Sequence, residues 1–323
     1  MKPRPEHHVR DATLDAFVSH DAPMRACLER AVAAARTDLP VLILGESGTG
    51  KTLLARAIHN SSKRRGGPFV SFNAAALSET LLDSQLFGHE RGAFTGAHSR
   101  VKGKFELADT GTLFFDEIAD LSPQGQSKIL RAIEYGEFER LGAETLHTAD
   151  VRVLSATHLA LPELMKSGAF RRDLFHRLNG VAITVPPLRE RPHDLKALVA
   201  SEIARAGRAQ QRTIAGLEPA ALTLLLTYPW PGNLRELAKV AEAAVALAPG
   251  DVIERAQVAL LLDGVVDTMA PAAGAHGLRL ESAVRAHIRY VLEHVGGNKR
   301  RAARELGIAR ATLERKLAEM ARD

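Results

Sequence analysis

The sequence contains a single cysteine, Cys27, and little that suits an oxidising or membrane environment. One thiol cannot form an internal disulfide or a thiolate metal cluster, which is typical of proteins from a reducing compartment. No apolar run approaches the roughly 20 residues of a membrane span. The N-terminal segment MKPRPEHHVR also lacks the apolar stretch of a secretory signal. We therefore expect a cytoplasmic protein with no membrane partner.

Charge of one sign accumulates only near the C-terminus. The 323 residues carry a net charge of +5. Residues 298–323 hold eight Lys or Arg and four Asp or Glu, which places +4 there and leaves +1 for the rest. This basic end indicates a polyanionic partner, although a solvated helix face can have the same composition. The length and the 46% apolar content suit about two globular domains.

Short runs rich in β-branched and apolar residues predict buried strands. They alternate with helix-like segments, which is typical of a parallel sheet with helices on both faces. The strand-like runs are 41–45, 68–73, 111–117, 151–157 and 180–186, and the helix-like segments include 51–60, 77–87 and 123–135. The predicted fold class is therefore α/β.

The following section, residues 189–262, shows helical periodicity without strand signals and is broken by the turn YPWPGN at 228–233. It predicts a small all-helical subdomain. Residues 264–277 are rich in Gly, Ala and Pro, which is typical of a linker. Further helix-like segments come after it.

The run GESGTGKT follows the first predicted strand and opens a helix. Its G-x-x-x-x-G-K-[ST] pattern is a phosphate-binding loop, because glycines let backbone N–H groups converge on phosphates and the helix N-terminus adds a positive field. We expect Lys51 to reach the β- and γ-phosphates and Thr52 to ligate Mg²⁺. The expected ATP-binding residues of this run are Gly45, Glu46, Ser47, Gly48, Thr49, Gly50, Lys51 and Thr52.

Two acids end the strand-like run GTLFFDE, at the edge where open α/β sheets bind ligands. We expect Asp116 to join the Mg²⁺ shell and Glu117 to polarise the attacking water. The alternative is a pair of surface acids at a strand end. Together with the phosphate-binding loop, the acids predict hydrolysis of a nucleoside triphosphate.

The stretch ERGAFTGAHSR, residues 90–100, places Phe94 and Thr95 between two Gly-Ala pairs. Glycines free the backbone to turn tightly, and the alanines offer Phe94 little apolar surface. Either the ring folds back into the core, or it is held out for a partner.

These motifs resemble the AAA+ activators of sigma-54 RNA polymerase, also called bacterial enhancer-binding proteins, from about Asp15 to the C-terminus. The most specific motif is GAFTGA, within LFGHERGAFTGA. In that family the loop projects from the ATPase core and engages sigma-54, moving as ATP is bound and hydrolysed. The resemblance implies contact with the sigma-54 RNA polymerase holoenzyme, for which an exposed aromatic is well suited. The implied contact residues are Gly92, Ala93, Phe94, Thr95, Gly96 and Ala97.

The resemblance also implies roles outside these motifs. Asn73, in SFNAAAL, matches the asparagine that holds the catalytic glutamate until the nucleotide state changes. Arg171 and Arg177, in FRRDLFHRL, match arginines that reach into the site of the neighbouring subunit, which implies a ring, by resemblance a hexamer. Arg235, in WPGNLREL, matches the sensor arginine of the helical lid and adds an ATP-binding residue.

The chain departs from the family pattern in three places. His158 stands where the family usually has an asparagine that positions water and the γ-phosphate. Because imidazole protonation varies near neutral pH, we expect slower or pH-sensitive turnover, with His158 among the catalytic residues. Thr52 replaces a glutamate common in the family and supports Mg²⁺ binding. About 15–20 residues stand where the family carries a sensory domain, so we expect a separate regulatory protein.

The C-terminal segment resembles a Fis-type helix-turn-helix domain. Asn298 can cap its second helix, Gly307 can end that helix, and a third helix would bury Leu313. Arginines of the third helix suit guanine edges, while those of the second suit phosphates. The alternative is a basic three-helix cap used for dimerisation. The expected DNA-binding residues are Arg300, Arg301, Arg310, Thr312, Arg315 and Lys316.

The expected division of the chain is an N-terminal tail at 1–14, an α/β subdomain at 15–188, a helical lid at 189–262, a linker at 263–278 and the helix-turn-helix domain at 279–323. The resemblance implies an activator that needs ATP and Mg²⁺, binds enhancer DNA and remodels the closed sigma-54 polymerase complex. Two alternatives stay open. One is a DNA-binding regulator that works by occupancy, with nucleotide as an assembly ligand. The other is an AAA+ machine that acts on another client.

Overall fold

The computed structural model describes residues 12–74, 79–143 and 145–269, together with Lys299, Arg301, Ala303 and Leu313. The chain divides into two compact units, residues 1–262 and 263–323. Within the described part, no helix is long and apolar enough to cross a bilayer.

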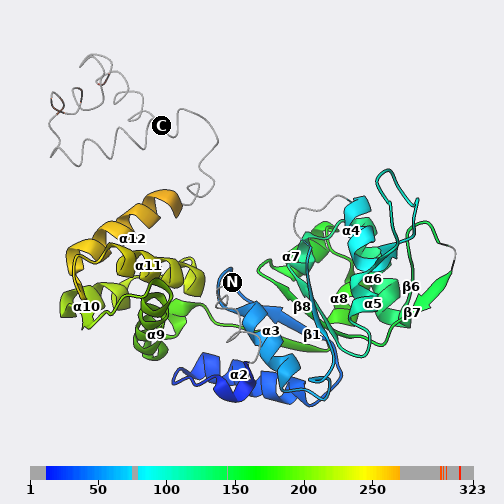
Figure 1. Ribbon diagram of the computed structural model, residues 1–323, viewed down its shortest axis with the longest axis horizontal. Helices are drawn as coiled ribbons and strands as arrows, with labels where there is room; N and C mark the ends of the chain where they lie inside the picture. Colours follow the sequence, from blue (N-terminus) through cyan, green and yellow to red (C-terminus); the bar gives the residue numbers. More distant parts are fainter. Residues whose placement is uncertain are drawn as a thin grey trace. The chain divides into compact units, whose positions relative to one another are not determined.

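A five-stranded parallel sheet forms the centre of the first unit (Figure 1). Its order is β2-β5-β8-β1-β9, and all neighbouring pairs are parallel. The strands are β1 Val41–Leu44, β2 Phe69–Asn73, β5 Thr112–Asp116, β8 Arg152–Thr157 and β9 Val181–Thr184. These are the five strands predicted from the sequence. Because they are parallel, their carboxyl ends meet at one edge, where the phosphate-binding loop and the acidic pair begin.

Side chains of each strand alternate between two cores, one on each face of the sheet. On β5, Leu113 and Phe115 join one core and Phe114 joins the other. On β1, Leu42 and Ile43 divide in the same way. A parallel strand buried on both faces is apolar at most positions, which is why these strands read as largely apolar runs; buried polar residues such as Thr112 and Ser155 are exceptions.

Helices cover both faces of this sheet (Figure 1). Met24 and Leu54, on α2 and α3, pack in one core, and Leu86 and Ile129, on α4 and α6, pack in the other. The helical elements are η1 Leu14–Ala16, α2 Ala22–Ala35, α3 Lys51–Asn60, α4 Glu79–Phe87, α5 Lys104–Leu107, η2 Ile118–Asp120, α6 Pro123–Tyr135, α7 Leu161–Ser167, α8 Arg172–Leu178 and η3 Leu188–Glu190.

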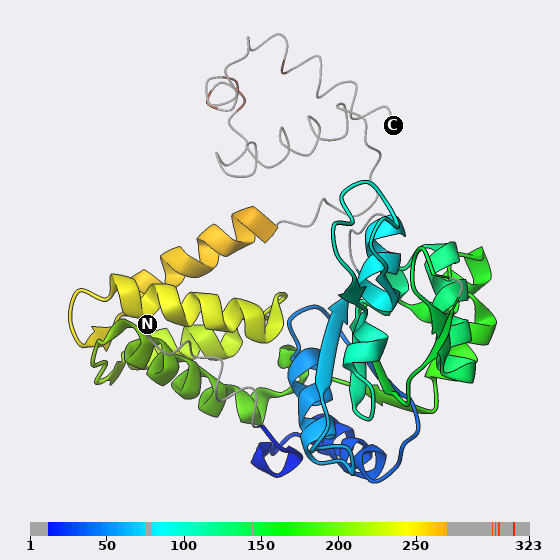
Figure 2. The ribbon, with the colours of Figure 1, turned by 45° about the vertical axis from the view of Figure 1, so that its right-hand side comes forward.

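Two short hairpins extend the α/β part beyond the central sheet. The antiparallel pairs are β3 Gly88–His89 with β4 Val101–Lys102, and β6 Glu137–Glu139 with β7 Leu146–Thr148. A bridge between His89 and Leu141 joins the two hairpins. The GAFTGA segment is the tip of the first hairpin and leaves the body of the fold beside α4 (Figure 2).

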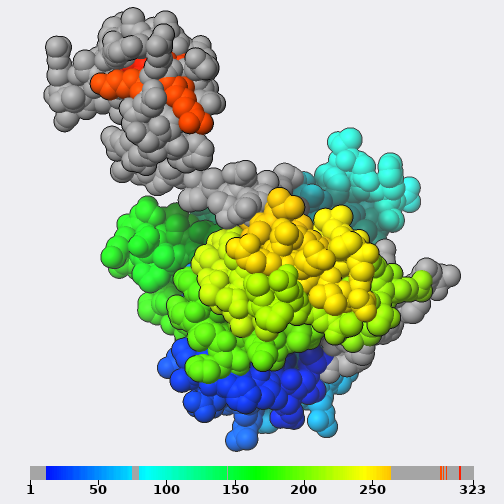
Figure 3. Space-filling view, turned by 90° about the vertical axis from the view of Figure 1, so that its left-hand side faces the viewer, coloured from blue at the N-terminus to red at the C-terminus, as the bar shows by residue number. Residues whose placement is uncertain are grey.

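Four helices form the lid, whose surface runs from green to orange in Figure 3. They are α9 Pro192–Gln210, α10 Pro219–Thr227, α11 Asn233–Leu247 and α12 Arg255–Met269. Trp230, in the turn YPWPGN, is fully buried, and its indole N–H donates to the carbonyl of Leu225 at 2.9 Å. The turn therefore anchors the lid as well as interrupting its helices.

The lid differs from the sequence expectation in two respects. The strands β10 Gly216–Leu217 and β11 Val252–Ile253 form a small parallel pair, whereas we expected no strands here. Strands of two residues have no periodicity that a sequence can reveal. Helix α12 also continues through Met269, into the segment from position 263 that we expected to be a linker. The first proline that interrupts this segment is Pro271.

Beyond the end of α12, the described residues of the second unit are Lys299, Arg301, Ala303 and Leu313, all helical. Leu313 and Ala303 are buried, with 0% and 4% of their surface exposed. Lys299 and Arg301 are exposed. The burial of Leu313 agrees with its predicted place inside a helix-turn-helix core. The other residues named for this domain, Asn298, Arg300, Gly307, Arg310, Thr312, Arg315 and Lys316, lie outside the described residues.

Candidate nucleotide site and effector loop

The loop between β1 and α3 adopts a backbone conformation that favours glycine. Gly48 and Gly50 have φ angles of +79° and +99°. A Cβ atom at Gly48 would lie 2.4 Å from the carbonyl oxygen of Gly232, so no side chain fits there. The loop leads into the first turn of α3, whose free N–H groups attract anions. This geometry suits a phosphate group.

Lys51 is buried and turned into this loop. Its Nζ donates to the carbonyls of Gly45 at 2.8 Å and Glu46 at 3.1 Å, and lies 3.8 Å from Oε1 of Glu117. Burial lowers the pKa of Lys51, and the charges of Glu117 and Asp116 oppose that shift. A buried ammonium held mainly by carbonyls gains stronger partners from phosphate oxygens.

Thr52 and Asp116 provide oxygen ligands suited to a magnesium ion. Thr52 Oγ1 donates to Asp116 Oδ2 at 3.2 Å, so the start of α3 and the end of β5 meet at the sheet edge. Mg²⁺ is commonly held by one or two protein oxygens together with phosphates and waters. The pair therefore fits Mg²⁺ bound with a nucleotide.

Glu117 directly follows β5 and has a φ angle of +53°, which is uncommon for a residue other than glycine. Its Oε2 accepts the backbone N–H of His158 at 3.2 Å and lies 2.8 Å from Nδ1 of the same residue. Asn73 ends the adjacent strand β2 in register with Asp116. Three neighbouring strands thus bring Asn73, the acidic pair and His158 to one edge.

The lid reaches the phosphate-binding loop through the start of α11. Arg235 Nη1 donates to Ser47 Oγ at 2.7 Å, and the backbone N–H of Leu234 donates to the carbonyl of Gly48 at 3.0 Å. Arg189 forms two hydrogen bonds with the Glu46 carboxylate, at 2.6 and 2.9 Å, which hold the pKa of Glu46 below its ordinary value. Arg235 thus lies where a lid residue can respond to bound phosphate.

Asn233 is a residue that sequence reasoning missed. It is fully buried with a φ angle of +53°, and its Oδ1 accepts the backbone N–H of Leu188 at 2.7 Å. Its Nδ2 donates to the Ser47 carbonyl at 3.1 Å and to Glu46 Oε2 at 3.2 Å. One amide therefore ties the lid to the loop. The available signal was its position after Pro-Gly, because asparagine tolerates the left-handed conformation in turns.

Arg171 and Arg177 lie at α8, apart from this cluster. Arg171 pairs with both oxygens of Asp173, at 2.6 and 3.0 Å, and donates to Ser127 Oγ at 3.0 Å. Arg177 donates to the carbonyls of Ile133 and Glu134, at 3.4 and 3.2 Å. Among the described residues, neither guanidinium bonds to the phosphate-binding loop of its own chain, so their role at a neighbouring site stays a prediction.

The GAFTGA loop closes on itself through backbone hydrogen bonds. The N–H of Gly92 donates to the carbonyl of Ala97 at 2.9 Å, and the N–H of Ala97 donates to that of Phe94 at 3.0 Å. Gly92 and Gly96 have φ angles of +86° and +102°, which explains both glycines. Thr95 is exposed at the tip.

Phe94 is half-buried. Its position is therefore intermediate between the two alternatives drawn from the sequence, a ring folded into the core and a ring held out for a partner. Its ring meets the imidazole of His89 edge to face, with the centroids 4.9 Å apart. Nδ1 of the buried His89 lies 2.8 Å from Ser84 Oγ, on α4. Sequence reasoning considered only apolar side chains as packing partners for Phe94 and so missed the imidazole of His89.

Arg140 is a second residue that sequence reasoning missed. Its guanidinium is 3% exposed and donates to Glu90 Oε1 at 2.7 Å and to Glu106 Oε2 at 2.6 Å. Burial acts to raise the pKa of Glu106, but hydrogen bonds from Arg140 and Lys102 outweigh it and hold that pKa below its ordinary value. Arg140, which directly follows β6, therefore links Glu90, just before the GAFTGA segment, to Glu106 on α5, the helix that follows β4. Three positions so far apart in the chain leave no local motif.

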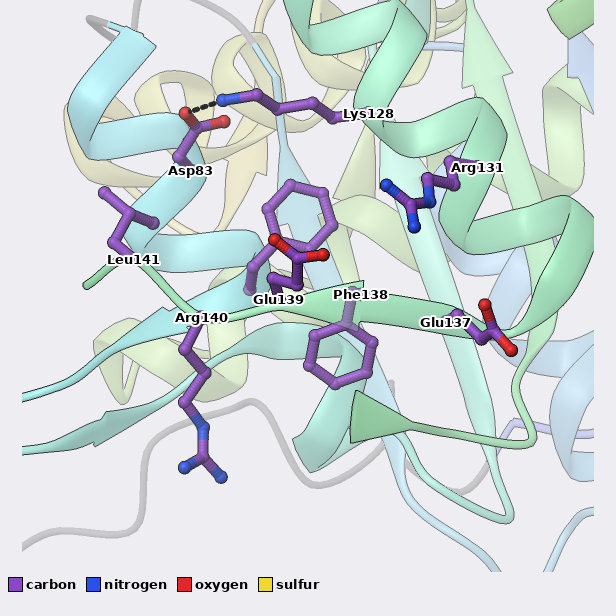
Figure 4. Close-up of a pocket in the computed structure, with 9 residues that line it drawn as sticks. Asp83, Lys128, Arg131, Glu137, Phe138, Glu139, Arg140 and Leu141 are labelled. Atoms are coloured by element: carbon purple, nitrogen blue, oxygen red, sulfur yellow. Dashed lines mark hydrogen bonds and ion pairs between the residues drawn. The ribbon is translucent and has the colours of Figure 1, made fainter. Parts of the chain in front are cut away.

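A cavity of about 280 Å³ lies beside this fastening, where α4, α6 and β6 meet (Figure 4). Asp83 and Lys128 form an ion pair at its rim, and Phe87 and Phe138 supply apolar lining. The cavity includes Arg140 but no residue of the predicted nucleotide site. The cavity is therefore part of the region that holds the two hairpins, apart from the predicted nucleotide site.

Three family models match consecutive parts of the chain. "Sigma-54 interaction domain" covers residues 17–184, "AAA+ ATPase lid domain" covers 189–270 and "Bacterial regulatory protein, Fis family" covers 281–320. The chain belongs to the sigma-54-dependent transcriptional activators. This confirms the resemblance based on the phosphate-binding loop and GAFTGA, and the predicted fold class of a parallel-sheet AAA+ core, a helical lid and a Fis-type domain.

Similar proteins agree with this membership. The transcriptional regulatory protein ZraR of Klebsiella oxytoca is 46% identical over 298 residues, covering 92% of this chain and 67% of that protein. The hydrogenase transcriptional regulatory protein HoxA of Cupriavidus necator is 43% identical, covering 92% and 63%. NtrX of Brucella abortus in complex with ATP has a TM-score of 0.70 and 33% identity, covering 94% and 69%. The RuvB motor of Thermotoga maritima, with a TM-score of 0.52 and 18% identity, shares the fold.

This activator is therefore a sigma-54-dependent transcription regulator with an AAA+ ATP-binding domain and a helix-turn-helix DNA-binding domain.

Proposed function

We propose that this activator hydrolyses ATP with Mg²⁺ and couples hydrolysis to remodelling of the closed sigma-54 polymerase complex through the GAFTGA loop. The observation that carries the proposal is the meeting of Lys51, Asp116 and Glu117 at one sheet edge, within reach of a lid arginine. Family membership supplies the partner.

The residues at the sheet edge divide the chemistry among them. Bound ATP would supply the phosphoryl group that is transferred to water, and a Mg²⁺ ion held beside it would offset the phosphate charge. Lys51 would hold the β- and γ-phosphates, and Thr52 with Asp116 would hold the Mg²⁺ ion. Glu117 would orient the attacking water and accept its proton. Arg235 would stabilise phosphate charge from the lid.

Arg171 and Arg177 are proposed to complete the site of a neighbouring subunit in a ring, which we take to be a hexamer. Both side chains are exposed, and Arg171 is held by the exposed Asp173. A phosphate can replace that carboxylate as the partner of a guanidinium. Hydrolysis would then depend on assembly, because each subunit supplies charge stabilisation to the next.

The path from nucleotide to loop is proposed to pass through α4. Asn73, the proposed switch for Glu117, ends β2, and α4 is the next element along the chain. Helix α4 carries Ser84, which bonds His89 beneath Phe94. A shift of α4 would therefore change the support of Phe94 and the presentation of Thr95 to sigma-54.

Binding of enhancer DNA is assigned to the C-terminal domain. Arginine pairs with guanine edges in the major groove, and basic side chains pair with phosphates. The proposed contacts are Arg300, Arg301, Arg310, Thr312, Arg315 and Lys316.

Transcription in vitro from a sigma-54 promoter, with purified polymerase, ATP and two variants, tests the proposal. Thr95→Ala should abolish open complexes and keep ATPase activity within about twofold, because Thr95 is exposed and outside the nucleotide site. Glu117→Gln should bind ATP but neither hydrolyse it nor activate. Open complexes with the Thr95 variant would refute the loop assignment. Activation by the Glu117 variant would favour regulation by occupancy.

A further inference from the structure

We propose that His158 is a positioning residue that holds Glu117 in an idle orientation and makes ATP turnover fall as the pH is lowered. The inference rests on the proposed role of Glu117 in hydrolysis.

The carboxylate of Glu117 is divided between two neighbours. Oε2 receives two contacts from His158, at 2.8 Å from the ring Nδ1 and 3.2 Å from the backbone N–H. Oε1 lies 3.8 Å from Lys51 Nζ, which is beyond hydrogen-bond length. His158 is therefore the closer of the two partners of Glu117. It occupies Oε2, a carboxylate oxygen that a catalytic base would need free to accept a proton from water.

The protonation of the ring decides how strong this hold is. A carboxylate only accepts hydrogen bonds, so the short contact requires a proton on Nδ1. A second proton on the ring adds a full positive charge, and charge-assisted bonds are roughly twice as strong as neutral ones. The ring is 41% exposed, so water reaches it. In the described part of the chain, Lys51 on α3 and the adjoining Asp116 on β5 also place charges near Glu117.

The deciding measurement is the steady-state ATPase rate of the full chain with Mg²⁺ and ATP between pH 6 and pH 8. His158→Asn keeps an N–H donor but cannot change charge in this range. We expect wild-type kcat to fall about fivefold further than that of the variant between pH 8 and pH 6, the difference between a charge-assisted and a neutral bond. The KM for ATP should stay equal in the two proteins, because His158 holds Glu117 rather than the phosphates.

His20→Asn is the matched control, since His20 is exposed and bonds Asp194 through its backbone N–H. It should keep the wild-type pH profile. His158→Gln supplies a second neutral donor should the asparagine variant fail to fold, and binding of a fluorescent ATP analogue checks that each variant retains its site.

Parallel pH profiles for wild type and a folded, ATP-binding His158 variant would overturn the inference. A pH profile that flattens in the His158 variants alone would support it. Glu117→Gln separates this result from the proposed function. If that variant hydrolyses ATP at the wild-type rate, Glu117 is not the catalytic base and the proposed function fails. If it is inactive while the His158 profiles stay parallel, only the present inference fails.

Discussion

The nucleotide site and the GAFTGA hairpin belong to the same subdomain but are held in place by different forces. The nucleotide residues follow adjacent parallel strands, so the backbone ladder of the sheet fixes their spacing. The hairpin has a two-residue pair at its base and depends on side chains, chiefly Arg140 and His89. The backbone hydrogen bonds of a central sheet break only when the sheet unfolds, whereas a few side-chain contacts can break and re-form while the fold stays intact. The comparison suggests a rigid chemical site beside an effector that can move.

The largest expected effect is a loss of ATPase activity that a change in the nucleotide site causes and a change beside the hairpins does not. Lys51→Ala removes the buried ammonium of the phosphate-binding loop, and we expect ATPase activity to fall by about 100-fold or more. Lys128→Ala, which breaks a surface pair with Asp83 beside the hairpins, should leave the KM for ATP unchanged. A coupled enzyme assay measures both. An equal loss of ATPase activity in the Lys51 and Lys128 variants would show that the nucleotide site and the residues that support the hairpins form one unit.

The next effect concerns stability on the hairpin side. Arg140→Ala removes the buried guanidinium that bonds both Glu90 and Glu106, which keep only their exposed partners Arg100 and Lys102, and we expect the free energy of unfolding to fall by about 2 kcal/mol. Lys102→Ala removes an exposed partner of the same Glu106 and should cost less than about 1 kcal/mol. Urea denaturation compares the two. Similar values would mean that Arg140 does not fasten the hairpins.

A glycine pair sharpens the nucleotide side of the comparison. Gly48→Ala forces a Cβ against Gly232 in a left-handed conformation, so we expect about tenfold weaker ATP binding, equal to about 1.4 kcal/mol. Gly168→Ala has a similar φ angle of +77° but open space around it. It should keep normal affinity for ATP. Titration with a fluorescent ATP analogue measures the dissociation constants, and equal weakening in both variants would mean that the fit between loop and lid is unimportant.

Acid sensitivity provides a smaller effect on the hairpin side. Because the pKa of Glu106 is lowered in the fold, its ionised form stabilises the protein above the unfolded value, about 4.3, and this stability is lost as the pH falls through the folded value. Glu106→Gln should therefore make the loss of stability between pH 5 and pH 3 shallower. Denaturation midpoints across this range provide the measurement. An unchanged slope would show that other carboxylates account for the acid sensitivity.

The smallest expected effect lies at the loop itself. His89→Ala removes the ring on which Phe94 rests, and an aromatic contact of this kind contributes about 0.5–1.5 kcal/mol. We expect about threefold tighter binding of sigma-54 in the absence of nucleotide, since Phe94 is released. Ser84→Ala should shift affinity in the same direction by less, because it loosens only the support of His89. Fluorescence anisotropy with labelled sigma-54 measures both, and weaker binding by the His89 variant would mean that the contact presents Phe94 rather than holding it back.

Sequence reasoning succeeded where the interacting residues are close together in the chain and failed where they are far apart. The phosphate-binding loop and the acidic pair are contiguous patterns attached to strands, and the structure brings Lys51, Thr52, Asp116 and Glu117 together as expected. The half-buried position of Phe94 depends on His89 and on Ser84 of α4, whose meeting no periodicity reveals. Arg140 depends on two carboxylates at positions 90 and 106, reached only when the chain folds back.

The sequence by itself determined the class of this protein: five buried strands, a loop for phosphate, an acidic strand end, and the motifs of a sigma-54 activator with a DNA-binding domain. Apolar periodicity and glycine requirements act over a few residues, so they are legible along the chain. The tertiary structure decided which side chains meet: His158 with Glu117, Asn233 with the phosphate-binding loop, and Arg140 with Glu90 and Glu106. Those pairings depend on distance in space, which folding creates between residues far apart in sequence.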